Sequence, residues 1–263
     1  IWIGDHFMAN AADTSSRWGE AWTTLAALAA QTSNVQLGTL VTGNTYRNPC
    51  ILAKQVAQVD VISGGRVILG IGAGWQENEH VAYDVPFFTA PVRLQRLEES
   101  VQILRSLFDN PSTNFEGRHY HIVDAPLNPK PAQAHLPILI GGGGERVTLR
   151  LVAQYADAWN VTTPADEFGR KSHILDEHCE RIGRDPASIH RTGAVLLSPG
   201  GPEGSTHLRF TPFSKLSDLV DVLSPFADAG ADEMIVHFNP GLPWEQRKEL
   251  WTGFMQDVAP QLT

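Results

Sequence analysis

The stretch NPCILAKQVAQVDVISGGRVILGIGAGW, residues 48–75, joins one amphipathic helix to one apolar strand and decides the fold. Asn48 before Pro49 predicts a helix start, because asparagine caps the first turn and proline fits the first helical position. Gly64-Gly65 predicts its end. The apolar residues that the helical spacing places on one face are Ile51, Leu52, Val56 and Val59. The apolar run 67–72 then predicts a buried strand.

The same alternation of strand and helix extends along the 263 residues. Near-continuous apolar runs are typical of parallel strands buried on both faces. The expected strands are 1–4, 35–42, 67–72, 137–141, 157–161, 191–197 and 233–238. Further helices are expected over 19–31, 91–108, 145–155, 165–183, 214–229 and 244–259, the 214–229 helix with Ser214 as its cap. Repeated strand–helix units predict a parallel sheet, either an open doubly wound sheet or a closed barrel.

The chain is predicted to form one domain over residues 1–263. Residues 111–136 are rich in proline and indicate an insertion with a hairpin around 115–120. Residues 198–212 are expected to form a second long loop, and loops of that length over a barrel often act as lids. Ile1-Trp2-Ile3-Gly4 begins as a strand already under way, so we expect that the true N-terminus is missing.

Composition excludes several classes of protein. A net charge of −9 disfavours binding to nucleic acid or to an anionic membrane surface. Cys50 and Cys179 are far apart and show no metal-ligand spacing, so neither a disulfide framework nor a zinc site is expected. Two free thiols fit a reducing cytoplasm. The sequence shows no signal peptide and no apolar run of roughly 18 residues, the minimum for a transmembrane helix.

Four places follow predicted strands, where barrels carry their active sites. Asp5-His6 pairs a carboxylate with an imidazole, which can bind a polar ligand and move a proton, although a capping aspartate and a surface histidine explain it equally well. The segment 38–43 ends a strand. The segment 69–75 is rich in glycine, which permits close approach of a ligand to the backbone. Its glycine spacing is a weak match to a dinucleotide-binding fingerprint.

The fourth place, Ile140 to Arg146, contains four successive glycines between a strand and a helix. Backbone N–H groups at a helix N-terminus bind phosphate, and Arg146 adds charge-assisted hydrogen bonds. A plain flexible turn is the alternative. The residues alone therefore predict a parallel α/β protein that binds a phosphorylated ligand near an Asp-His pair.

In its order of motifs, the chain resembles the luciferase-like monooxygenase superfamily, and within it the actinobacterial oxidoreductases that depend on the deazaflavin coenzyme F420. The motifs are GDHF (4–7), LGTLVT (37–42), DVISGGR (60–66), 69–75, 138–146, YADAWN (155–160) and AGADE (229–233). The resemblance implies a (β/α)8 TIM barrel with insertions, of which the first βα unit is absent from the sequence. It also implies a homodimer.

The resemblance assigns roles to individual residues. Asp5 would contact the deazaflavin, and His6 would lie near its ring and stabilise charge during hydride transfer. Thr39, Leu40 and Val41 would lie behind the ring, with a non-prolyl cis peptide at Leu40-Val41. The remaining cofactor contacts that it implies are Ala73, Gly74 and Asn78 at the ring, and Gly142, Gly143, Gly144, Glu145 and Arg146 at the phosphate.

Two departures argue against sugar-phosphate oxidation. The family's sugar-phosphate dehydrogenases carry a glutamate where this chain has Trp75, and a tryptophan where it has Asn10. Glu77 and Glu79 are left as candidate proton donors, with a solvated helix start as the alternative. Trp75 and His80, together with the two long loops, are expected to shape the substrate pocket.

The expected reaction is hydride transfer between the deazaflavin and an unidentified organic substrate. One alternative is an FMN-dependent monooxygenase that takes reduced flavin from a separate reductase and reacts with oxygen. The other alternative is a non-catalytic paralogue that binds cofactor without turnover. No metal is expected in any of them.

Overall fold

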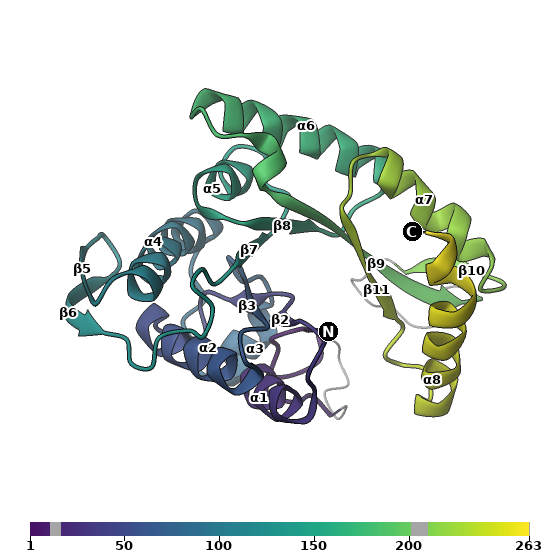
Figure 1. Ribbon diagram of the computed structural model, residues 1–263, viewed down its shortest axis with the longest axis horizontal. Coiled ribbons are helices and arrows are strands. Elements are labelled where there is room, and N and C mark those ends of the chain that lie inside the picture. The colour runs from purple at the N-terminus through teal and green to yellow at the C-terminus, as the bar shows by residue number, and fades with distance from the viewer. Residues whose placement is uncertain (11–16, 201–209, 263) are drawn as a thin grey trace. The chain divides into compact units, whose positions relative to one another are not determined.

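The computed structural model describes residues 1–10, 17–200 and 210–262, in which strands and helices alternate along the chain (Figure 1). The chain forms two compact units, Ile1–Ala158 and Trp159–Thr263. Both contain parallel strands connected through helices, which confirms the α/β class. That the chain is one domain stays a prediction.

The first unit contains a parallel sheet in the order β1-β2-β4-β7, with β3 also beside β4. In register, Trp2 pairs with Gly38, and Leu37 pairs with Val67. Its strands are β1 (Trp2–Ile3), β2 (Leu37–Thr39), β3 (Thr42–Gly43), β4 (Val67–Gly72) and β7 (Ile138–Gly141). Its helices are α1 (Ala21–Gln31), α2 (Pro49–Ser63), α3 (Glu77–Ala82), α4 (Ala90–Asp109) and α5 (Thr148–Tyr155).

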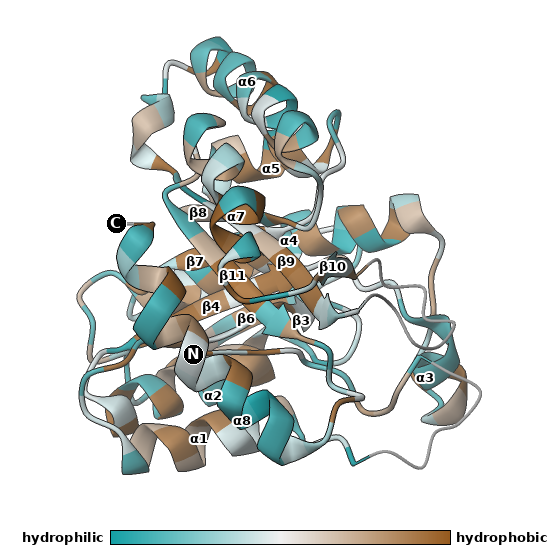
Figure 2. Cartoon of the chain, turned by 90° about the vertical axis from the view of Figure 1, so that its right-hand side faces the viewer, coloured by the Kyte–Doolittle hydropathy of each residue, from teal (hydrophilic) through white to brown (hydrophobic). Residues whose placement is uncertain are grey.

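The second unit has β9 (His190–Pro199) paired in parallel with both β10 (Thr211–Phe213) and β11 (Glu233–Phe238). The first residue of strand β8 (Ala158–Val161) belongs to the first unit, and the rest of the strand belongs to the second. Its helical elements are α6 (Ala165–Arg181), η1 (Pro186–Ser188), α7 (Asp218–Asp228), α8 (Trp244–Gly253), the π-helical turn η2 (Phe254–Val258) and η3 (Ala259–Gln261). Brown segments along β9 in Figure 2 mark its hydrophobic residues.

The helix α2 begins and ends as predicted. The side chain of Asn48 accepts a hydrogen bond from the N–H of Cys50, and Gly64 ends the helix with φ at +69°. Of the four apolar residues placed on its inner face, three are buried, but Ile51 is 58% exposed, so its placement was wrong. Leu52, Val56 and Val59 follow one another at intervals of four and three residues, which keeps them on one face of the helix. Ile51 points about 100° away from Leu52 around the helix axis.

Other element boundaries differ from the predictions. The strand expected over 35–42 is two short strands, interrupted at the Leu40-Val41 peptide bond, which is cis as expected. Ser214 does not cap α7, because the helix begins at Asp218, whose carboxylate accepts hydrogen bonds from the N–H groups of Ser214 and Lys215. The expected 145–155 helix begins only at Thr148, which leaves the glycine-rich segment as a loop.

Aromatic packing holds the second unit together. Trp159 stacks on Phe168 with ring centroids 5.3 Å apart, and Phe168 meets Phe226 edge-on at 5.9 Å. These contacts join β8, α6 and α7, and burial of such rings contributes about 1.5–3 kcal/mol each. The amide of Asn160 donates to the hydroxyl of Thr192 at 2.7 Å, which links β8 to β9.

The insertion at 111–136 contains the predicted hairpin, formed by β5 (Ser112–Glu116) and β6 (His121–Pro126). Gln133 anchors its end to Asp60 of α2 and to the carbonyl of Val67. That the insertion shapes a substrate pocket stays a prediction. Within the predicted loop 198–212, residues 201–209 lie outside the described residues, and the flanking residues continue β9 and begin β10.

Among the helices of the described residues, none is both long and apolar enough to cross a membrane.

Candidate active site

Three segments that follow β1, β3 and β4 converge at the carboxyl ends of these strands. The side-chain amide of Gln76 donates to the carbonyl of Met8 at 2.9 Å, and that of Asn78 donates to the carbonyl of Ala9 at 3.1 Å. The N–H of Asn44 donates to the carbonyl of Gly72 at 2.9 Å. Parallel strands align their carboxyl ends at one edge, which explains why residues about 70 positions apart meet here.

His6 and Glu79 form a hydrogen-bonded pair at the centre of these segments. Nδ1 of His6 lies 2.7 Å from Oε1 of Glu79, whose other oxygen accepts the N–H of Phe7 at 2.8 Å. The side chain of Glu79 is fully buried, and that of His6 is 19% exposed. A carboxylate that faces Nδ1 holds the proton there, so Nε2 is the imidazole nitrogen that is left for a ligand.

The hydroxyl of Tyr46 also donates to Oε1 of Glu79. Burial alone would raise the pKa of Glu79, but the hydrogen bonds from His6, Tyr46 and the N–H of Phe7 outweigh it and lower the pKa below its usual value. Burial and the Glu79 carboxylate raise the pKa of Tyr46, so that its hydroxyl stays a donor. Glu79 is therefore ionised at neutral pH, and the solvated helix start considered as an alternative does not describe it.

Asp5 is 1% exposed and forms a two-point ion pair with Arg47. Its two carboxylate oxygens accept from the Arg47 guanidinium at 2.6 and 3.1 Å, and Glu20 accepts from the same guanidinium at 2.6 Å. Burial raises the pKa of Asp5, and the hydrogen bonds and charge of Arg47 offset only part of that effect. Asp5 thus fixes Arg47 and the start of the His6 segment, and direct contact between Asp5 and a cofactor stays a prediction.

His80 is 1% exposed, and Trp75 is 51% exposed. Nδ1 of His80 donates to the carbonyl of Gln76 at 2.6 Å, and its Nε2 is hydrogen-bonded to the hydroxyl of Thr45, also at 2.6 Å. These bonds make His80 a support of the Thr45 loop. Glu77 is exposed at the start of α3. The substrate-pocket role of Trp75 and His80 stays a prediction.

The side chain of Val41, which follows the cis peptide, fits among glycines. A Cβ on Gly72 would lie 2.8 Å from Val41, and one on Gly141 would lie 2.9 Å from it. A Cβ on Gly70 would lie 1.9 Å from the carbonyl oxygen of Thr39. No real Cβ tolerates such distances, so these glycines are required for the close approach of β2, β4 and β7.

The glycine-rich loop after β7 runs from Gly141 to Val147. Gly142 has φ at +129°, a conformation that only glycine adopts readily. A Cβ on Gly144 would lie 2.8 Å from the hydroxyl of Thr148, the first residue of α5. Arg146 is exposed, and Gly143 and Glu145 are half-buried. The loop thus brings backbone close to the N-terminus of α5, as a phosphate cradle requires.

Two buried polar atoms beside the convergent segments lack a hydrogen-bond partner: Nδ2 of Asn44 and Oδ1 of Asn78. Unpaired buried polar atoms are uncommon, and each is a point at which a ligand or water would supply the missing bond. One donor and one acceptor, together with the half-buried Gly74 (φ +78°), are the kinds of group that the hydrogen-bonding edge of a flavin-like ring requires. The residues present therefore fit such a group.

Several residues of this site were missed from the sequence: Tyr46, Arg47, Glu20 and Trp18. Arg47 sits one residue before the cap of α2, and only the fold shows that it reaches two carboxylates. Trp18 lies edge-on to His6, with ring centroids 6.1 Å apart. Their sequence surroundings carry no motif that could have identified them.

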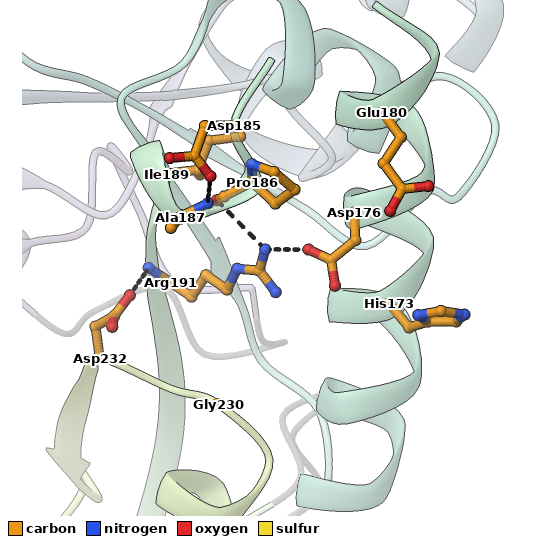
Figure 3. A pocket seen from close by; sticks show the side chains of 10 residues that line it. All are labelled: His173, Asp176, Glu180, Asp185, Pro186, Ala187, Ile189, Arg191, Gly230 and Asp232. Atoms are coloured by element: carbon orange, nitrogen blue, oxygen red, sulfur yellow. Dashed lines mark hydrogen bonds and ion pairs between the residues drawn. The ribbon is translucent and has the colours of Figure 1, made fainter. Parts of the chain in front are cut away.

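A pocket of about 540 Å³ lies elsewhere, where α6, η1 and the start of β9 meet (Figure 3). Arg191 lines it and pairs with Asp176, while the N–H of Arg191 donates to Asp232 at 2.7 Å. None of the predicted site residues lines it. Within the described residues, no group of three or more histidine, cysteine, aspartate or glutamate side chains is arranged to hold a metal ion.

Comparison with known proteins shows the family to which the chain belongs. The family model for luciferase-like monooxygenases matches residues 1–202. An F420-dependent glucose-6-phosphate dehydrogenase of Amycolatopsis mediterranei is 35% identical over 158 residues, 59% of this chain and 45% of the relative. The pyrimidine monooxygenase RutA of Stutzerimonas stutzeri is 33% identical over 187 residues, 68% of this chain and 49% of the relative. The chain spans about half the length of these two relatives.

Among solved structures, an F420-dependent secondary alcohol dehydrogenase in complex with an F420-acetone adduct superimposes with a TM-score of 0.85. The match covers 100% of this chain and 89% of the other, at 18% sequence identity. The predicted fold, of the (β/α)8-barrel type, is confirmed by this likeness.

Proposed function

The chain belongs to the luciferase-like monooxygenase family, and from that premise we propose that it is an oxidoreductase that transfers a hydride between a deazaflavin of the F420 type and an organic substrate. The observation that carries the proposal is the His6–Glu79 pair, with Nε2 of His6 left for a ligand, in the same unit as the glycines that surround Val41. When bound, the deazaflavin supplies two-electron chemistry without activating oxygen.

The binding site for the deazaflavin ring is assigned to Val41, Gly74 and Asn78, with Thr39, Leu40 and Ala73 next to them in sequence. Asn78 orients the ring through its unpaired Oδ1, and Asn44 offers a matching donor. The phosphate-bearing side chain is assigned to the loop of Gly142, Gly143 and Gly144, next to Glu145 and Arg146. The unpaired Oδ1 of Asn78 and the left-handed conformation of Gly142 support these assignments.

His6 holds and moves the proton that accompanies the hydride. With its Nδ1 proton directed at Glu79, neutral His6 accepts a proton at Nε2 from a substrate hydroxyl, and protonated His6 returns one to a carbonyl. Glu79 orients His6 rather than donating a proton itself, since three hydrogen bonds lower its pKa. Tyr46 completes this support.

Binding of the cofactor tests the proposal. The purified protein is titrated with oxidised deazaflavin and, separately, with FMN, while intrinsic tryptophan fluorescence is followed. Micromolar or tighter binding of the deazaflavin, at least tenfold tighter than FMN, is expected. Binding of neither compound would refute the proposal and favour a degenerate barrel that has lost its cofactor site.

A flavin-dependent monooxygenase is the second candidate, and the 33% identity to a pyrimidine monooxygenase favours it. In that case FMN binds more tightly than the deazaflavin, and reduced FMN from a separate reductase is oxidised with consumption of oxygen.

The proposal also includes a homodimer and a cytoplasmic location. Apolar side chains on the outer face of α2, with Ile51, Val61 and Ile62 41–58% exposed, support an association of copies. The free thiols Cys50 and Cys179 support a reducing compartment. Sedimentation velocity tests the first point, and localisation of the tagged protein in cells tests the second.

A further inference from the structure

Two indole rings meet the imidazole of His6 edge-on. Trp75 lies edge-on to the imidazole with ring centroids 5.5 Å apart and planes at 75°, and Trp18 lies edge-on at 6.1 Å and 88°. The exposed fractions are 51% for Trp75 and 42% for Trp18. Large aromatic side chains normally bury most of their area, and exposed ones beside a reactive group mark a surface that takes an apolar ligand.

The charges beside His6 oppose an anionic ligand. Glu79 is ionised at 2.7 Å from the imidazole. The positive charge of Arg47 is already shared between the carboxylates of Asp5 and Glu20. Of these four side chains three carry carboxylates, so an anion placed against His6 would meet net repulsion.

Arg93, the cation that contacts the Gly74 loop, adds one positive charge, and the three carboxylates still outnumber the two guanidinium groups. Its Nε donates to the carbonyl of Gly74 at 3.0 Å, its Nη1 donates to the carbonyl of Phe88, and it lies 4.3 Å over the ring of Phe87. Its guanidinium is thus directed to the backbone and to an aromatic face.

We propose that the substrate is an uncharged molecule with a flat apolar body, which packs against Trp75 and Trp18 and presents its carbonyl or hydroxyl oxygen to Nε2 of His6. This substrate class rests on the proposed function. It excludes a phosphorylated sugar, the substrate that the name of the dehydrogenase from Amycolatopsis mediterranei states. Indole rings bind a planar ring through stacking and edge contacts, whereas the neighbouring carboxylates repel a phosphate group.

Calorimetric titration with three probes tests the inference: 2-acetylnaphthalene, 2-naphthoate and glucose 6-phosphate. The two naphthalene compounds share the same ring system and differ in charge, which isolates the electrostatic effect. Each titration is made with and without saturating deazaflavin. The measurement therefore reports on the aromatic surface even if the deazaflavin itself does not bind, which separates failure of this inference from failure of the proposed function.

We expect 2-acetylnaphthalene to bind at least tenfold more tightly than 2-naphthoate, and glucose 6-phosphate to give no heat of binding at millimolar concentration. Trp75→Ala should weaken the binding of 2-acetylnaphthalene at least tenfold, and Trp75→Phe by no more than about threefold. The matched control is Trp244→Ala, which removes a 62% exposed tryptophan of the second unit and should leave the affinity within twofold.

Three results would overturn the inference. The first is equal or tighter binding of 2-naphthoate or glucose 6-phosphate. The second is a loss of affinity in Trp244→Ala as large as in Trp75→Ala. The third is glucose 6-phosphate binding that disappears in Arg17→Ala, because Arg17 is an exposed cation next to Trp18 and would then be recruiting the phosphate.

Discussion

Replacement of Glu79 by glutamine probes the support of His6 most directly. The carboxylate accepts three hydrogen bonds, two at Oε1 from His6 and Tyr46 and one at Oε2 from the N–H of Phe7. An amide has one oxygen. If that oxygen takes the Oε1 position, the NH2 group faces the N–H of Phe7, and two donors meet in a buried place.

The magnitude follows from these contacts. Two hydrogen bonds to a charged acceptor become neutral ones, at a loss of about 1 kcal/mol each, and one buried N–H loses its partner at a cost of about 1–3 kcal/mol. Glu79→Gln should therefore destabilise the protein by about 3–5 kcal/mol. In a domain of this size 1 kcal/mol shifts Tm by roughly 2–4 °C, so Tm should fall by roughly 6–20 °C.

Thermal unfolding at neutral pH provides the assay, with Glu77→Gln as the matched control. Glu77 lies two residues earlier in α3 and is exposed, so its replacement should change stability by no more than about 0.5 kcal/mol. Nitrogen NMR of His6 reports the tautomer, which should stay Nδ1–H in Glu79→Gln, because the amide oxygen at the Oε1 position still accepts the Nδ1 proton. Equal Tm values for the two variants, or a change of tautomer to Nε2–H, would refute the reasoning.

Three further outcomes are expected. Folding lowers the pKa of Glu79, so the stabilisation by its carboxylate is complete above the ordinary pKa of 4.5. That stabilisation is lost as pH falls through the lower pKa of the folded state. Tm should therefore decline below about pH 4.5, and it should decline less steeply in Glu79→Gln. Gly70→Ala should prevent folding or cost more than about 4 kcal/mol of stability, because its Cβ would lie 1.9 Å from a backbone oxygen. Gly4→Ala, whose Cβ would have its nearest contact at 3.7 Å, should be tolerated. Soluble yield and Tm of the two variants check this pair. Arg47→Met should lower the free energy of unfolding by about 3–5 kcal/mol, because it leaves the buried Asp5 carboxylate unpaired. Asp5→Asn should cost clearly less, since burial already disfavours the charge of Asp5. Denaturant unfolding of both variants measures the two costs, and a reversed order contradicts the account.

Local signals predicted most elements because they depend on neighbours in the chain. Asn48, Pro49 and Gly64 set the bounds of α2 through backbone conformation, and the structure confirms both ends. The same approach failed for Ile51, because helical spacing says which residues share a face but not how wide the buried face is. It failed for Ser214, because a serine caps only where the first turn actually begins.

The sequence by itself determined the α/β class, the order of strands, and the glycine-rich segments at the ends of β4 and β7. These follow from periodicity and from conformations that only glycine adopts, both of which are local properties. Only the tertiary structure decided that Glu79 orients His6, that Arg47 pairs with Asp5, and that Trp18 and Trp75 both meet the imidazole edge-on. Hydrogen bonds and ring contacts between residues up to 73 positions apart depend on how parallel strands bring their carboxyl ends together, and no pattern along the chain encodes those distances.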